Sequence, residues 1–253
     1  MHTAIIVPAR LGSTRFPQKL LHPVRGKPVL LWTAEQIRRE APEFDLWFAV
    51  DSERLKNLLE AEGYRAVITD PELPSGTDRI AAANEQIGAT RIINVQADEP
   101  MVTGEQIRLL DKILTPGVDM ATLGFPLTTD RDYHNPNHVK MVCAQDGAAL
   151  YFSRSPIPYV RETVGRYDAD LTGPEGVLIH VGLFAYTQEF LATFAKLPMS
   201  HLERLEKLEM LRALEHGYRI ATAVTHDTLI EIDTPENIIQ FEEAVTEHFN
   251  PEY

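Results

Sequence analysis

The sequence has little cysteine, little positive charge and no long hydrophobic run. One cysteine in 253 residues excludes an internal disulfide and fits a reducing compartment. Asp and Glu number 37 against 24 Lys and Arg, which argues against a nucleic acid polymer or an anionic membrane surface as the main partner. No apolar stretch approaches the roughly 20 residues that cross a bilayer, and no secretory signal is visible. The sequence predicts a cytoplasmic protein.

Two glycine-rich nucleotide-binding motifs are also missing. The chain contains neither a Walker A sequence nor a Gly-x-Gly-x-x-Gly fingerprint, which argues against a P-loop ATPase and makes an NAD-dependent oxidoreductase the weakest alternative. The length allows one large α/β domain or two small ones. Because no repeat or convincing linker is present, we expect a single domain over residues 1–253, with an insertion at roughly 138–187.

The first half of the chain alternates apolar, β-type runs with helical patterns. This alternation predicts right-handed βαβ units and a mostly parallel sheet. Longer strands in the middle predict an antiparallel extension that carries substrate contacts or a dimer surface. The expected strands are 4–7, 46–50, 66–69, 92–95, 120–125, 138–143, 148–152, 177–186, 219–224 and 228–232, and the expected helices are 29–40, 53–62, 77–87, 104–114, 202–215 and 235–249.

A cationic loop, residues 8–19, follows the first expected strand. Arg10, Arg15 and Lys19 lie there among small residues, although the chain as a whole is acidic. Small residues let the backbone approach a ligand, and the cations suit a polyphosphate. The alternative is an exposed basic loop whose two prolines hold its shape.

Two aspartates follow other expected strands. Asp98 follows the strand at 92–95, and Asp233 follows the strand at 228–232. Ligands of an open parallel sheet bind beyond the carboxyl ends of its strands, so the two carboxylates can meet beside the cationic loop. Mg²⁺ commonly takes one or two carboxylates together with water and substrate phosphates. The alternative is that each aspartate caps a helix.

Three further features allow two interpretations each. The segment from Ser75 to Arg79 opens a helix, where it either caps the helix or points donors at a base or phosphate. Arg154 follows an apolar strand and either clamps a substrate carboxylate or forms an internal ion pair. His180 lies inside an apolar strand and is either a core histidine or a ligand contact.

Taken together, these motifs resemble the 3-deoxy-manno-octulosonate (Kdo) cytidylyltransferase family of lipopolysaccharide biosynthesis. The resemblance covers nearly the whole chain, in the family's order and spacing. It rests on PARLGSTRFPQK, SGTDR, NVQADEP, ALYFSRSPIP, HVG, a leucine- and glutamate-rich helix and IDTPE. It implies a Rossmann-like nucleotidyltransferase fold, the substrates CTP and Kdo, the cofactor Mg²⁺ and a homodimer.

The resemblance also implies roles for individual residues. Arg10, Lys19 and Asp98 would be catalytic, and Asp98 and Asp233 would bind Mg²⁺. The nucleotide would contact Pro8, Ala9, Arg10, Ser13, Arg15, Lys19, Ser75, Gly76 and Arg79, and the sugar acid would contact Gln96, Arg154, His180 and Glu209.

Some positions depart from the family pattern. Ala97 and Gln18 stand where glycine is usual, Leu20 replaces a proline, Met210 replaces a glutamine and Glu231 replaces a small residue. These departures keep another acceptor open: 8-amino-3,8-dideoxy-octulosonate or a nonulosonic acid, because an added carboxylate suits an amino sugar. A metal-dependent glycosyltransferase and a non-catalytic nucleotide binder are more distant alternatives.

Overall fold

The computed structural model describes residues 2–12, 16–173, 176–227 and 230–248. Contacts divide the chain into two compact units, which are described one at a time. The first unit comprises residues 1–107 and 229–253, and the second comprises residues 108–228. The expected single domain and the expected homodimer stay predictions.

The first unit is built on a parallel sheet, as the sequence predicts. Its strand order is β6-β1-β4-β5, with all neighbours parallel. The central strand is buried from Ala4 to Ala9, which is why it reads as an unbroken apolar run. The strands are β1 (Thr3–Ala9), β4 (Asp45–Val50), β5 (Arg65–Ile68) and β6 (Arg91–Asn94).

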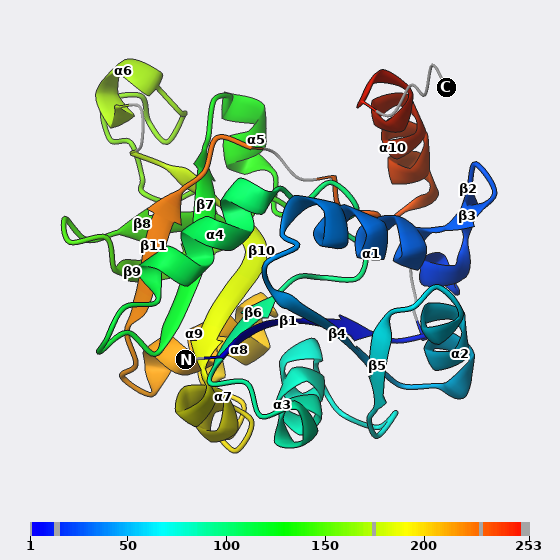
Figure 1. Cartoon of the computed structure of the whole chain (residues 1–253). Coiled ribbons are helices and arrows are strands. Elements are labelled where there is room, and N and C mark those ends of the chain that lie inside the picture. Colours follow the sequence, from blue (N-terminus) through cyan, green and yellow to red (C-terminus); the bar gives the residue numbers. More distant parts are fainter. Residues whose placement is uncertain (1, 13–15, 174–175, 228–229, 249–253) are drawn as a thin grey trace. The chain divides into compact units, whose positions relative to one another are not determined.

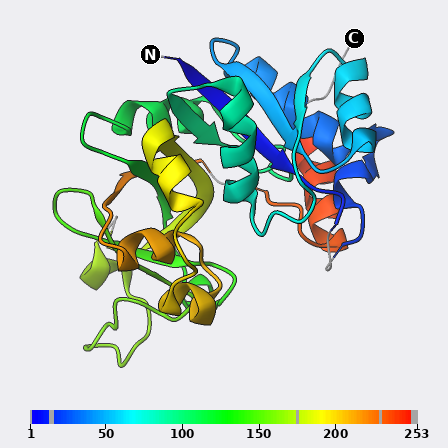
Figure 2. The same cartoon turned by 90° about the horizontal axis from the view of Figure 1, so that it is seen from below.

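Helices connect these strands and lie on both faces of the sheet. Figures 1 and 2 show α1 and α3 on opposite faces. Helix α2 begins after Ser52, whose hydroxyl accepts from the backbone N–H of Leu55. The helices are α1 (Val29–Glu40), α2 (Glu53–Ala61), α3 (Gly76–Ile87) and α10 (Pro235–His248), while α4 (Gly104–Ile113) crosses the boundary between the units along the chain.

The strand order places a ligand site beside β1. The chain adds β4 and β5 on one side of β1 and then returns to its other side with β6. The reversal leaves a crevice at the carboxyl ends of β1 and β6, where open α/β sheets bind ligands.

Short elements that the sequence did not predict follow β1. The 3-10 turn η1 (Lys19–Leu21) begins after Gln18, and β2 (Pro23–Val24) pairs with β3 (Lys27–Pro28). Gln18 has a φ of 55°, in the left-handed region that favours glycine. Gln18 is one of the positions where the family pattern has glycine.

The second unit contains the expected antiparallel extension. Strand β7 lies between β10, which is antiparallel to it, and β11, which is parallel. Strand β8 pairs antiparallel with β10 and β9. The strands are β7 (Met120–Pro126), β8 (Lys140–Cys143), β9 (Ala149–Ser153), β10 (Leu178–Thr187) and β11 (Ile220–Val224), and the short helices are α5 (Asp130–His134), α6 (Ala169–Thr172) and α7 (Gln188–Phe194).

The single helix expected at 202–215 is wrong, because the segment forms two helices. Helix α8 (His201–Glu206) ends at Lys207, which has a φ of 56°, and α9 (Met210–Glu215) follows. The break lets Arg212 make a two-pronged, buried ion pair with Glu203, at 2.6 and 2.9 Å. Residues nine apart lie on opposite sides of a continuous α-helix, so this pair requires the break.

The expected strand at 228–232 is also wrong where the structure describes it. Residues 230–232 form no strand, and residues 228 and 229 lie outside the described part of the chain. The backbone N–H of Ile232 donates to the carbonyl of Asp98 at 3.0 Å. This bond fixes the segment before Asp233 without a neighbouring strand.

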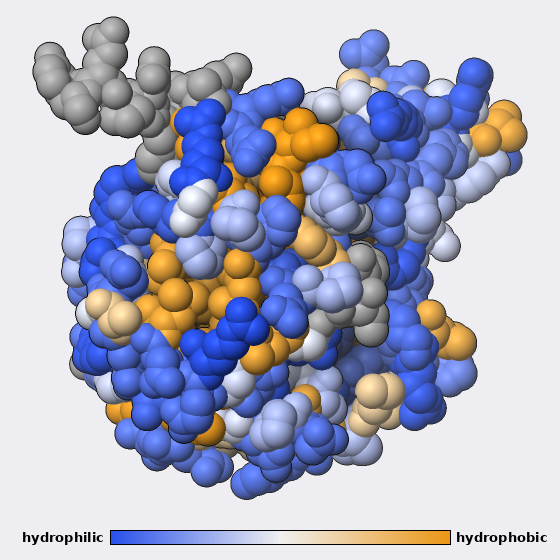
Figure 3. Space-filling view, turned by 90° about the vertical axis from the view of Figure 1, so that its right-hand side faces the viewer, coloured by the Kyte–Doolittle hydropathy of each residue, from blue (hydrophilic) through white to orange (hydrophobic). Residues whose placement is uncertain are grey.

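The face seen in Figure 3 is mostly polar, with hydrophobic residues in several smaller groups among the hydrophilic ones. In the first unit, the exposed large hydrophobic residues of the described chain are Ile68 and Ile239. Over the described residues, no helix combines the length and apolar character needed to cross a membrane.

Candidate active site

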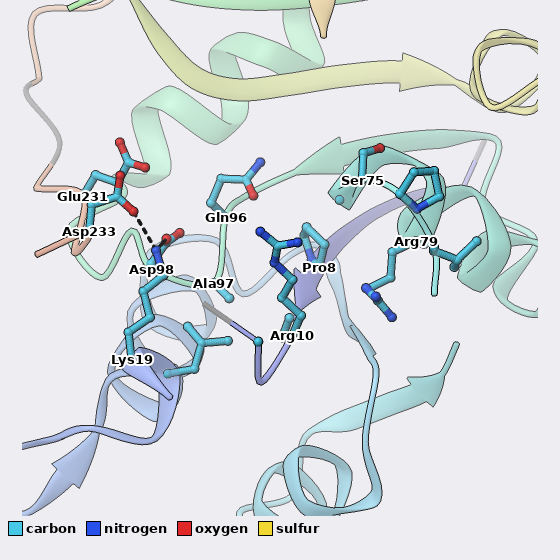
Figure 4. Close-up of a pocket in the computed structure, with 16 residues that line it drawn as sticks. Pro8, Arg10, Lys19, Ser75, Arg79, Gln96, Ala97, Asp98, Glu231 and Asp233 are labelled. Atoms are coloured by element: carbon cyan, nitrogen blue, oxygen red, sulfur yellow. Dashed lines mark hydrogen bonds and ion pairs between the residues drawn. The ribbon is translucent and has the colours of Figure 1, made fainter. Parts of the chain in front are cut away.

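A cavity of about 410 Å³ opens at the carboxyl ends of β1 and β6 in the first unit. Figure 4 shows Arg10 and Arg79 toward one side of it and Asp98, Asp233 and Glu231 toward the other. Its lining residues are Pro8, Ala9, Arg10, Gly12, Lys19, Leu20, Leu73, Pro74, Ser75, Gly76, Arg79, Gln96, Ala97, Asp98, Glu231 and Asp233. Segments far apart in sequence therefore meet at one site.

Arg10 and Arg79 form the basic side of the cavity, and polar contacts hold this side in place. The backbone N–H of Leu11, next to the exposed Arg10, donates to both carboxylate oxygens of Asp51 at 3.1 Å. Arg79 is 3% exposed and donates to Thr69 Oγ1 at 2.6 Å and to the Asp70 carbonyl. Burial lowers the pKa of Arg79. Both hydrogen-bond acceptors of Arg79 are neutral, and the carboxylates of Asp51 and Asp70 favour its positive charge electrostatically.

Helix α3 begins at the cavity wall. The Ser75 hydroxyl accepts from the backbone N–H of Asp78 at 3.1 Å and donates to Asp78 Oδ2 at 2.6 Å. The capping interpretation of Ser75 therefore holds in this structure. A Cβ at Gly76 would lie 3.3 Å from Pro8 Cγ, so glycine allows the close approach of α3 to β1. The first turn of α3 brings its positive dipole end to the cavity.

Lys19 connects the two aspartates on the acidic side. Its ammonium group donates to Asp98 and, at 2.8 Å, to Asp233 Oδ1 (Figure 4). Burial opposes the charge of Lys19, but the negative charge of Asp98 and the hydrogen bonds that Lys19 donates to both carboxylates outweigh it and raise its pKa. The expected meeting of Asp98 and Asp233 is thus present in the structure.

Helix α1 holds the loop that carries Asp98. Thr33, which is fully buried, donates from Oγ1 to the carbonyl of Ala97 at 2.9 Å. Gln36 donates from Nε2 to the carbonyl of Val102 at 2.8 Å. The two bonds fix the backbone on both sides of Asp98.

The donor set on the acidic side fits a hard divalent cation. One oxygen from each of Asp98, Glu231 and Asp233 lies within 4.8 Å of the others. Carboxylate oxygens are the ligands that Mg²⁺ prefers. Burial and the negative charges of Asp98 and Asp233 raise the pKa of Glu231 to about 7, although the residue as a whole is exposed. The residues present are compatible with a magnesium ion.

Glu99 is a buried carboxyl next to this cluster. It is 3% exposed, and its Oε2 has no hydrogen-bond partner among the described residues. Burial, followed by the charges of Glu231 and Asp98, raises its pKa well above the usual range. Glu99 therefore favours its neutral form in the absence of a cation.

The expected sugar contacts are divided between the two units. Gln96 lines the cavity, and its Nε2 donates to Asn94 Oδ1 at 3.4 Å. In the second unit, Arg154 donates from Nε to the Glu206 carbonyl at 2.7 Å and from a terminal nitrogen to the Pro136 carbonyl at 3.0 Å. These bonds point the Arg154 guanidinium at backbone carbonyls of its own unit.

His180 and Glu209 also lie in the second unit. His180 Nε2 is 2.9 Å from the hydroxyl of Thr122, and burial lowers the His180 pKa to about 3. The histidine is therefore neutral at pH 7. Glu209 precedes the first residue of α9, Met210, which is 4% exposed. The departure at Met210 from the family pattern thus places a core residue there.

Two expected nucleotide contacts, Ser13 and Arg15, lie outside the described residues. Of the residues that the structure adds, Glu231 is the most informative. In the sequence, Glu231 is a departure from the family pattern that suits an amino sugar and is not grouped with Asp98 and Asp233, yet it lines the cavity beside them. Its place two residues before Asp233 is the signal that could have grouped the two side chains.

Comparison with known proteins identifies the family of the chain. A family model described as cytidylyltransferase matches residues 4–220. The 8-amino-3,8-dideoxy-manno-octulosonate cytidylyltransferases of Shewanella halifaxensis and Shewanella piezotolerans are 43% and 41% identical to the chain over 244 residues, which are 94% of the chain and 96% of each relative. A solved CMP-2-keto-3-deoxy-manno-octonic acid synthetase with CTP is 32% identical, with a TM-score of 0.88 over 98% of this chain and 99% of that one. The fold and the resemblance predicted from the sequence are confirmed, and the chain belongs to the cytidylyltransferase family of nucleotidyltransferases.

Proposed function

We propose that the protein transfers CMP from CTP to the anomeric hydroxyl of 8-amino-3,8-dideoxy-manno-octulosonate and releases pyrophosphate. The observation that carries this acceptor is the 43% identity, over 94% of the chain, to a relative named for it. Kdo, which the sequence favoured, is the second candidate. It is supported by the 32% identity to the solved synthetase that is named for that acid.

The nucleotide would bind on the basic side of the cavity. Arg10, Arg79 and the first turn of α3 offer positive charge and N–H donors to the triphosphate. Lys19 would exchange its carboxylate partners for a phosphate. These groups neutralise the charge that grows on the departing pyrophosphate, which is how positioned cations lower the barrier of phosphoryl transfer.

Asp98 and Asp233 would hold Mg²⁺. Such an ion, when bound, supplies charge neutralisation and orientation of the phosphates. The role of the protein's own residues is to hold the carboxylates of Asp98 and Asp233 in place. Thr33 does so through the Ala97 carbonyl, and the bond from Ile232 to the Asp98 carbonyl joins the two aspartate segments.

The acceptor would contact Gln96, Arg154, His180 and Glu209, as the family resemblance implies. In the reaction the anomeric oxygen forms a bond to the α-phosphorus, the bond from that phosphorus to the pyrophosphate oxygen breaks, and the hydroxyl proton passes to solvent. No covalent bond to the protein is needed, so the chain acts by positioning and charge stabilisation.

The test is pyrophosphate release by the purified chain with CTP and Mg²⁺, with the 8-amino acid, Kdo and sialic acid supplied in parallel. We expect the highest kcat/KM with the 8-amino acid and loss of the signal with EDTA. Asp98→Asn should lower kcat by at least about 100-fold and retain the fold, while Asp170→Asn in α6 is a control with the same charge change. Preference for Kdo would reject the proposed acceptor, and silence with all three acids would reject the reaction.

A further inference from the structure

Glu231 adds a third carboxylate to the pair implied to hold Mg²⁺. One of its oxygens lies within 4.8 Å of an oxygen of Asp98 and of Asp233. Figure 4 shows the three side chains together at the acidic side of the cavity. Two oxygens bound to one Mg²⁺ lie at most about 4.2 Å apart, because each Mg²⁺ to oxygen distance is about 2.1 Å. Oxygens within 4.8 Å of one another therefore need only small shifts to bind the same cation.

Three carboxyl groups gather in this cluster, and Lys19 is paired with two of them, Asp98 and Asp233. Glu99 is a second, independent observation at this place, because its buried Oε2 has no hydrogen-bond partner among the described residues and lies near the carboxyl groups of Glu231 and Asp98. A buried carboxyl oxygen without a hydrogen-bond partner is costly, and a nearby divalent cation would stabilise the ionised form of such a group.

We infer that Glu231 is a third protein ligand of the divalent cation, and that this chain therefore binds the cation before the nucleotide arrives. A magnesium site with one or two carboxylates depends on substrate phosphates and water for its remaining ligands. A third carboxylate replaces one water and adds a negative charge, so the cation binds without CTP. The inference rests on the proposed function, because the cation is the one that cytidylyl transfer would use.

Lys19 gives this inference a second consequence. Its ammonium group donates to carboxylate oxygens of Asp98 and Asp233 that would also bind the cation. Entry of the cation releases Lys19 from Asp98 and Asp233. The free ammonium group then becomes available to a phosphate of the incoming nucleotide, so cation binding prepares the basic side of the site.

The experiment is a titration of the nucleotide-free full chain with Mn²⁺, in which free Mn²⁺ is followed by its electron paramagnetic resonance signal. Glu231→Gln keeps the size of the side chain and removes its charge. The exposed Glu243→Gln in α10 makes the same charge change away from the cavity and is the matched control. We expect a Kd for Mn²⁺ at least about tenfold higher in Glu231→Gln, equivalent to about 1.4 kcal/mol, and the wild-type Kd in Glu243→Gln.

A second variant separates a ligand role from a loss of folding. Glu231→Asp keeps the charge on a shorter side chain and should recover part of the Mn²⁺ affinity, while thermal unfolding without metal shows whether each variant is folded. Wild-type affinity in Glu231→Gln, or no Mn²⁺ binding by the wild type without CTP, would overturn the inference.

One further outcome would assign Glu231 a different role. If Glu231→Gln keeps its Mn²⁺ affinity but loses the preference for the 8-amino acid over Kdo, then Glu231 recognises the ammonium group of the acceptor and the inference is wrong. The titration contains neither CTP nor a sugar acid. The Mn²⁺ titration therefore tests the role of Glu231 even if the proposed reaction is not found.

Discussion

Lys19 Nζ donates to Asp233 Oδ1 at 2.8 Å, across 214 positions of the chain. The same ammonium group also binds Asp98, and all three side chains are less than one-fifth exposed. A lysine that neutralises two carboxylates competes with any divalent cation for their oxygens. The ligand-free site is therefore stabilised by a residue that the proposed reaction assigns to a phosphate.

Replacement of Lys19 should make the stability of the chain depend on divalent cations. Lys19→Met removes charge-assisted hydrogen bonds and leaves carboxylates that repel one another, so we expect a loss of about 1–3 kcal/mol without metal. Mg²⁺ should then raise the Tm more in Lys19→Met than in the wild type, because the cation no longer competes with the lysine. Thermal unfolding with and without Mg²⁺ measures both effects.

Lys56→Met is the control for this experiment. Lys56 forms an i,i+4 pair with Glu60 on helix α2, outside the cavity, so its loss should leave the Mg²⁺ effect on the Tm unchanged. An equal rise in Tm for the wild type and Lys19→Met would show that the lysine and the cation do not share a site.

Thr33 should affect activity although it lies outside the cavity lining. Thr33→Val removes the donor to the Ala97 carbonyl, and a buried carbonyl without its partner costs about 1–3 kcal/mol. Because Ala97 precedes Asp98, we also expect a several-fold lower kcat for pyrophosphate release. Thr33→Ser keeps the hydroxyl and should restore kcat. Urea unfolding and steady-state kinetics measure the two effects.

Thr193→Val is the control, because the half-buried Thr193 donates to the Glu189 carbonyl on α7 at 2.9 Å, and its loss should leave kcat unchanged. If Thr33→Val is destabilised with an unchanged kcat, and Thr33→Ser behaves identically, then the Thr33 bond supports the fold only and does not position Asp98.

The parallel sheet and the place of the ligand site could both be predicted from the sequence, and the reason is physical. Strand β1 is buried on both faces, so it is continuously apolar, and the polar residues that end it are a visible boundary. The rule that ligands bind beyond the carboxyl ends of parallel strands then predicted that Asp98 and Asp233 meet. The meeting is found, although Asp233 follows an irregular segment held by the bond from Ile232 to the Asp98 carbonyl.

Other features depend on contacts that a local pattern does not contain. Residues 230–232 resemble a strand, but the structure gives them no strand partner. The leucine spacing of residues 202–215 is the same whether the segment is one helix or two. Only the pairing of Glu203 with Arg212 requires the break at Lys207, and this pairing is visible only in three dimensions.

The buried pair of Glu203 and Arg212 should contribute strongly to the stability of the second unit. Arg212→Leu leaves an uncompensated buried carboxylate, which costs about 3–5 kcal/mol. The double variant Glu203→Leu with Arg212→Leu removes both charges and should be more stable than Arg212→Leu alone. Urea unfolding of the two single variants and the double variant gives the coupling. Additive losses would show that the pair is not coupled.

His180 should make folding sensitive to mild acid. Thr122 Oγ1 donates its single proton to a backbone carbonyl, that of Leu183 at 2.7 Å, so His180 Nε2 must donate to Thr122 and the neutral Nδ1 is an acceptor. The rings of Phe152 and Phe184 lie 5.3 and 5.1 Å from the imidazole. Burial lowers the His180 pKa in the folded chain from 6.5 to about 3.

Between these two pKa values the unfolded chain binds a proton at His180 that the folded chain does not. His180 therefore leaves the free energy of unfolding unchanged above pH 6.5 and lowers it progressively as the pH falls toward 3. The expected loss from this residue between pH 8 and pH 5 is about 2 kcal/mol. His180→Gln cannot titrate, so urea unfolding at the two pH values should show a smaller decrease in the variant than in the wild type, by about that amount. Equal decreases in both proteins would mean that His180 is protonated in the folded chain near pH 6, and a charged imidazole would then be available to the sugar acid.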